Sequence, residues 1–124
     1  MGKIDRKDPK KITWSKLPAH PGNAHYRMAG GGSDREEKAY FAGGSDEVYD
    51  YDGIDANGKP AEPSPVVFAY NVKRDAWETI LENDSNATMD HRGMAVVPDG
   101  LIVPGGMSKG QKVEARVEML PKGK

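Results

Sequence analysis

The sequence predicts an all-β protein built from a repeated unit. The chain of 124 residues contains 15 Gly and 9 Pro, and its apolar runs are short. This composition is typical of strands joined by many turns, and it argues against helices. Three landmarks occur twice, 62 to 65 residues apart: Trp14 and Trp77, Arg27 and Arg92, and Gly43 and Gly105. Recurrence at one spacing indicates two copies of a strand unit.

The N-terminal part supplies a tail and one strand. Residues 1–10 are rich in lysine and are expected to form a flexible basic tail. Residues 11–17 alternate apolar and polar side chains and stop at Pro18, which predicts a short outer strand. The next strand is expected at residues 26–29, before three glycines that predict a tight hairpin. A phosphate-binding loop is not favoured, because the stretch at residues 30–38 supplies neither the required spacing of Lys and Ser or Thr nor the signal of a following helix.

Residues 25–81 are expected to form one complete unit of four strands. After the strand at 26–29, the second strand covers residues 38–42 and ends at Gly43-Gly44, a pair that permits positive φ and a close approach of backbone. The third strand covers residues 65–71, and the fourth covers residues 77–81. Between the second and third strands lies an acidic loop, residues 45–64. Its carboxylates do not follow the EF-hand spacing, so we expect a solvated or partner-facing loop without a metal site.

Residues 90–120 are expected to form a second unit that is incomplete. An inner strand at 91–97 is followed by a strand at 101–104, which ends at Gly105-Gly106. A third strand ends near Leu120, and residues 121–124 form a tail. The chain supplies no fourth strand to this unit.

The order of these landmarks resembles the kelch repeat, which forms one blade of a β-propeller. In the first unit Gly43-Gly44, Tyr70 and Trp77 match the kelch pattern, including the spacing from Tyr to Trp. The second unit keeps Arg92 and Gly105-Gly106 but lacks the Tyr and the Trp. The resemblance implies about two four-stranded antiparallel blades, which would form part of a propeller or close a ring by oligomerisation.

Charge and composition exclude several functions. The net charge of −1 offers no clustered positive surface for nucleic acid. The chain has no cysteine, which suits a reducing cytoplasm, and no apolar run long enough to span a membrane. A cytoplasmic location is therefore favoured, and a periplasmic one applies if the chain belongs to a longer exported protein.

Candidate site residues follow from the geometry of an antiparallel blade. The start of each inner strand and the end of each second strand lie at one edge, which in propellers is the usual binding face. We expect this face to hold the ligand-binding side chains Arg27, Asp46, His91, Arg92 and Ser108. Arginine suits such a site because its planar fork binds carboxylates with two hydrogen bonds. No catalytic triad, metal site or cofactor motif is expected.

Two function classes remain open at the level of sequence. The first is a binding module that holds a protein or a small acidic ligand on the loop face near the channel. The second, implied by the resemblance, is a sugar-processing enzyme of the sialic acid mutarotase or epimerase type, with Asp46 and His91 as the nearest acid/base candidates. Because two blades cannot close a ring, the remaining blades would come from a longer chain or from a homo-oligomer such as a trimer.

Overall fold

The computed structural model describes residues 1–123, and within that range all regular structure is β-strand. The strands are β1 (Gly2–Ile4), β2 (Ile12–Trp14), β3 (Ala29–Ser33), β4 (Lys38–Ala42), β5 (Val67–Asn71), β6 (Ala76–Leu81), β7 (Ala95–Val97), β8 (Gly100–Pro104), β9 (Met107–Ser108), β10 (Lys112–Val113) and β11 (Val117–Leu120). No helical segment in residues 1–123 has the length and apolar character needed to cross a bilayer. The all-β class expected from sequence is confirmed.

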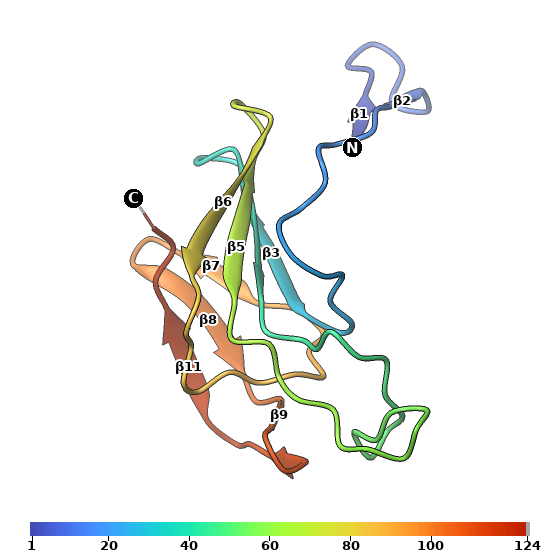
Figure 1. Cartoon of the computed structure of the whole chain (residues 1–124). Helices are drawn as coiled ribbons and strands as arrows, with labels where there is room; N and C mark the ends of the chain where they lie inside the picture. Colours follow the sequence, from blue (N-terminus) through green and yellow to red (C-terminus); the bar gives the residue numbers. More distant parts are fainter. Residues whose placement is uncertain (124) are drawn as a thin grey trace.

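The first unit forms a four-stranded antiparallel sheet in the order β3-β4-β5-β6. Its strands are neighbours both in the sequence and in the sheet (Figure 1). Short turns join β3 to β4 and β5 to β6, whereas the long segment at residues 43–66 joins β4 to β5. One detail differs from expectation, because the three glycines lie inside β3 and the turn follows at residues 34–37. A Cβ on Gly31 would lie only 2.9 Å from the side chain of Met94 and 3.0 Å from that of Val96. The absence of a side chain at Gly31 therefore lets residues 94–96 approach β3 closely.

The second unit forms a three-stranded antiparallel sheet in the order β11-β8-β7. This matches the three strands expected between residues 90 and 120. The residues that connect β8 to β11 form a small separate hairpin, β9-β10. The outer edge of β11 pairs with no other strand within the described residues.

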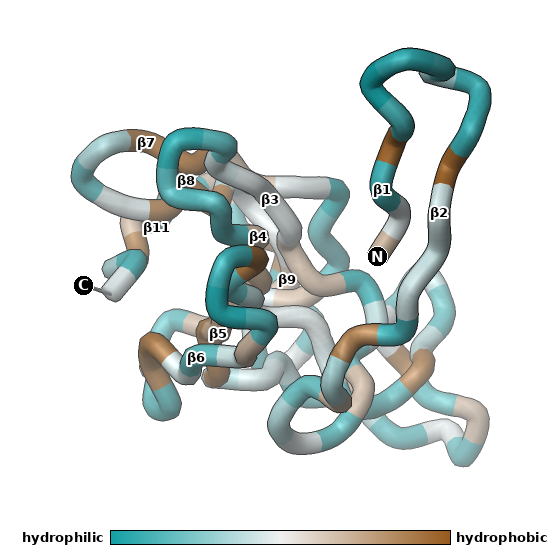
Figure 2. Tube along the Cα trace, turned by 90° about the horizontal axis from the view of Figure 1, so that it is seen from above, coloured by the Kyte–Doolittle hydropathy of each residue, from teal (hydrophilic) through white to brown (hydrophobic). Residues whose placement is uncertain are grey.

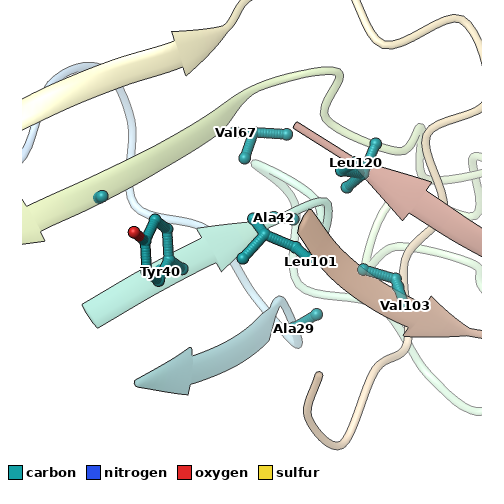
Figure 3. Packing of buried hydrophobic residues seen from close by; sticks show 8 residues of the cluster. Ala29, Tyr40, Ala42, Val67, Leu101, Val103 and Leu120 are labelled. Atoms are coloured by element: carbon teal, nitrogen blue, oxygen red, sulfur yellow. The ribbon is translucent and has the colours of Figure 1, made fainter. Parts of the chain in front are cut away.

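The main core lies between the two sheets, which pack face to face (Figures 1 and 3). The first sheet contributes Ala29, Tyr40, Ala42, Val67 and Ala69, and the second contributes Leu101, Val103 and Leu120. Each strand turns alternate residues toward this core, as pleating requires. A smaller core forms where Tyr49 and Ala61 of the acidic loop pack with Met89 and Met107.

The opposite face of the first sheet carries aromatic side chains. Phe68 and Trp77 lie there with ring centroids 5.5 Å apart. Residues 18–25 cover this face, since the ring of His20 stacks on Phe68 at 5.4 Å and the Trp77 indole N–H donates to the carbonyl of Pro18 at 2.8 Å. The segment that leads from the N-terminus is thereby held against the sheet.

The N-terminal residues differ from the expected flexible tail and blade strand. Residues 2–4 form β1 and pair with β2, which covers residues 12–14 of the strand expected at 11–17. Asp5 and Asp8 accept hydrogen bonds from backbone N–H groups two and three residues later, which shapes the turn. The hairpin stands clear of both sheets in two views (Figures 1 and 2), and Trp14 is 74% exposed.

Candidate functional site

The two glycine pairs surround a buried histidine. Gly43, Gly44, Gly105 and Gly106 all have positive φ, between 62° and 99°. A Cβ on Gly106 would lie 2.5 Å from Cε1 of His91, and a Cβ on Gly43 would lie 2.2 Å from the Thr88 carbonyl oxygen. Only glycine adopts these angles and leaves this space at low cost. The pairs thus allow the ends of β4 and β8 to meet the segment at residues 88–91.

His91 serves this packing. It is 7% exposed, and its Nε2 lies 2.9 Å from Oγ1 of Thr88. Burial lowers the pKa of the imidazole, so the neutral ring is favoured. A side chain so enclosed and hydrogen-bonded within the chain has little surface left for a ligand.

The two arginines that recur in the repeat share one carboxylate. Arg27 Nη1 donates to Asp90 Oδ1 at 2.7 Å, and Arg92 Nη1 donates to the same oxygen at 3.2 Å. Arg27 also lies over the rings of Tyr26 and Tyr49, at 5.0 and 5.5 Å from their centroids. Burial raises the pKa of the Asp90 carboxyl, but hydrogen bonds from the guanidinium groups outweigh burial and the net pKa is lowered. The positive charge of this pair is therefore partly compensated inside the chain.

Ser108 is engaged in its own hairpin. Its hydroxyl donates to Oε1 of Glu114 at 2.7 Å and lies 3.3 Å from the carbonyl of Lys112. The contact braces the β9-β10 turn. Ser108 is thus committed to a local structural contact.

Asp46 faces a different environment, a surface pocket with a volume of about 610 Å³. Oδ1 of Asp46 lies 3.2 Å from His25 Nε2, and its Oδ2 accepts a hydrogen bond from Asn23 Nδ2 at 2.9 Å. Four segments line the pocket: residues 21–25, residues 45–47 after β4, residues 62–66 at the end of the acidic loop, and residues 79 and 82 in and after β6. This volume lies within the range of small-ligand and peptide sites.

The pocket is acidic. Its lining includes Asp46, Glu47, Glu62 and Glu82, and no Lys or Arg of the described residues contributes to it. Two of these carboxylates have partners at the rim, since Asp46 meets His25 and Glu62 lies 3.2 Å from Lys109 Nζ. Glu47 and Glu82 make no ion pair among the described residues. The electrostatic field in the pocket therefore favours a cation over an anion.

His25 forms the inner wall of the pocket without forming a catalytic relay. Burial is the main cause that lowers the pKa of His25, and the nearby Asp46 opposes it only in part. Ser64 Oγ and Asp46 Oδ1 both face the same nitrogen, Nε2, at 3.4 and 3.2 Å. A Ser-His-Asp relay needs the acid and the hydroxyl on opposite ring nitrogens. This arrangement therefore does not activate the hydroxyl of Ser64.

The predicted site residues fall into three groups. Arg27, His91 and Arg92 lie beside or next to Asp90, whereas Asp46 lies in the pocket and Ser108 lies in the β9-β10 hairpin. Sequence reasoning missed Asp90, although its position beside His91-Arg92 was a signal. It also missed Glu82, because nothing in the local pattern shows that the end of β6 lines the same pocket as Asp46.

Comparison with known proteins adds no relative. No protein-family model matches this chain, and no curated protein sequence matches it.

Proposed function

We propose that this chain is a kelch-like binding module that holds a positively charged segment of a partner protein in its acidic pocket. The observation that carries the proposal is the pocket of about 610 Å³, which four carboxylates line and to which no Lys or Arg of residues 1–123 contributes. Glu47 and Glu82 are exposed, and exposed ion pairs contribute about 0.2–1 kcal/mol each. Two lysine or arginine side chains that reach these carboxylates supply enough energy to select a basic segment over a neutral one.

The same contacts favour a protein segment over a small acidic ligand. An acidic ligand needs free guanidinium groups, and both arginines already face the carboxylate of Asp90. An anion in the pocket would instead meet several carboxylates of its own sign, which disfavours its binding. Of the two occupants expected from sequence, we therefore place the protein first.

The enzyme alternative has less support. A mutarotase needs an available acid or base beside the arginines, and the acid found beside them, Asp90, is held by both. His91 is enclosed between the glycine pairs. We therefore place binding ahead of catalysis.

Titration of fluorescently labelled tetralysine tests the proposal. The wild-type protein should bind the peptide, and binding should weaken as salt is raised, because exposed charges are screened within about 10 Å at 0.1 M salt. The double variant Glu47→Gln/Glu82→Gln should weaken binding by about two- to thirtyfold, since two exposed ion pairs are lost. Asp99→Asn is the matched control, because Asp99 is exposed in the turn between β7 and β8.

Two results would contradict the proposal. One is equal affinity of the pocket double variant and the control variant for tetralysine. The other is binding of sialic acid by the wild-type protein that is lost in Arg92→Ala, because this result would favour a small acidic ligand over a basic protein segment.

A further inference from the structure

The N-terminal hairpin carries a concentration of positive charge. Residues 1–17 contain six basic and two acidic residues, a net charge of +4. The remaining residues contain 12 basic and 17 acidic residues, a net charge of −5. The near-neutral total thus hides a strong separation of charge along the chain.

The basic side chains of the hairpin are free to meet a partner. The two acids, Asp5 and Asp8, use carboxylate oxygens to accept backbone N–H groups in the turn, at 2.7 to 3.2 Å. The ion pairs of the described residues include no Lys or Arg from residues 1–17. Figure 2 shows the hydrophilic tip of the hairpin projecting away from the body. The turn therefore presents Arg6, Lys7, Lys10 and Lys11 on a preorganised support.

The hairpin also lacks the packing that would stabilise it, because a two-stranded sheet by itself is only marginally stable in water. Its apolar residues Ile4, Ile12 and Trp14 are 59%, 44% and 74% exposed. The cross-strand pairs Gly2–Trp14 and Ile4–Ile12 place these three side chains on one face. A partner that covers the hairpin would stabilise it.

The hairpin is not placed to fill the pocket of its own chain. Pro18 and His20 are fixed to the aromatic face of the first sheet by the Trp77 hydrogen bond and the stack on Phe68. Residues 21–25, which line the pocket, continue from this anchor in one direction, and the hairpin extends from it in the other (Figure 1). To enter its own pocket, the hairpin would have to fold back over the anchored segment.

We infer that the basic hairpin of one copy docks in the acidic pocket of a second copy. The inference rests on the proposed function and names a partner for the same site. Unpaired cations in the hairpin turn meet Glu47 and Glu82, which make no ion pair among the described residues, so the charges of the two surfaces are complementary. Because hairpin and pocket are different surfaces, the interface is head to tail, and it closes into a ring or continues as a chain. A foreign basic segment would bind by displacing the hairpin.

Light scattering and sedimentation velocity over a wide concentration range test the inference. The wild-type protein should associate at low salt and dissociate at high salt. Lys7→Glu/Lys10→Glu and Glu47→Lys/Glu82→Lys should each weaken association by at least about tenfold, because like charges then face each other. Lys73→Glu, in the exposed turn between β5 and β6, is the control and should associate like the wild type.

Mixing the two double variants gives the sharpest result. The hairpin variant keeps a wild-type pocket, and the pocket variant keeps a wild-type hairpin, so the mixture should associate although neither variant does alone. A wild-type monomer at all concentrations, or a mixture that stays monomeric, overturns the inference. Circular dichroism of each variant shows that a loss of association is not a loss of folding.

The outcomes separate the inference from the proposed function. If the wild type is monomeric but binds labelled tetralysine through Glu47 and Glu82, the proposed function stands and the inference fails. If copies associate through hairpin and pocket but tetralysine does not bind, the inference stands and a general preference for basic segments fails.

Discussion

The substitution Gly43→Ala tests whether the glycine pairs are required by contact between the units or only by their backbone angles. Gly43 has φ of 63°, and a Cβ at this position would lie 2.2 Å from the Thr88 carbonyl oxygen. Gly58 is a matched control, because its φ is 76° but, apart from its chain neighbours, no described residue has an atom within 4 Å of its Cβ position. Both substitutions incur the left-handed backbone cost of about 1–2 kcal/mol. Any change in unfolded-chain entropy is the same for both and cancels in their difference.

The contact adds two terms for Gly43→Ala alone. Forcing a methyl group into packed structure costs about 1–3 kcal/mol. Displacement of the Thr88 carbonyl also disturbs the hydrogen bond that it accepts from the Gly44 N–H at 3.1 Å, worth about 0.5–1.5 kcal/mol. Gly43→Ala should therefore lower the free energy of unfolding by about 2–4 kcal/mol more than Gly58→Ala.

Urea denaturation followed by circular dichroism and tryptophan fluorescence measures this difference, with coincident transitions as the check on two-state behaviour. Equal losses of stability in the two variants would refute the reasoning. That result would mean that the segment at residues 88–91 shifts freely and that the glycine pair matters only for its φ angles.

Three further predictions follow from the hydrogen bonds and pKa shifts. Arg27→Ala should lower the free energy of unfolding by about 1.5–3 kcal/mol. Arg92→Ala should lower it by less than about 1 kcal/mol, because the side chain of Arg92 is 75% exposed. Equal losses in urea denaturation would contradict this difference. Burial lowers the pKa of His91, so the unfolded chain binds the proton more readily than the folded chain. The free energy of unfolding should therefore fall as the pH drops below about 6.5, and the fall should be smaller in His91→Gln. A free energy of unfolding that rises toward acid pH would contradict this prediction. Asp50→Ala should lower the melting temperature more than Asp52→Ala, because Asp50 Oδ1 accepts two backbone N–H groups in the acidic loop, at 2.9 and 3.1 Å; similar melting temperatures would count against that role.

The sequence by itself determined the all-β class and the position of most strands. The apolar strands at residues 38–42, 65–71 and 101–104 were predicted within two residues, because alternation and burial leave a local pattern. Gly43 and Gly44 also have the positive φ that the sequence predicted for this pair. These features depend on residues that are close together in the chain.

Only the tertiary structure decided which segments meet. The three glycines at residues 30–32 were predicted to form a turn, but they lie in β3, where Gly31 leaves space for the side chains of Met94 and Val96. The guanidinium group of Arg27 was predicted to face a ligand, but the chain brings Asp90 to it from 63 residues away. The acidic pocket is likewise formed by four segments, and nothing in the sequence around Glu82 indicates that this residue lines it. The physical reason is that burial favours specific residue types locally, whereas an exposed charge accepts any opposite charge that folding brings within reach.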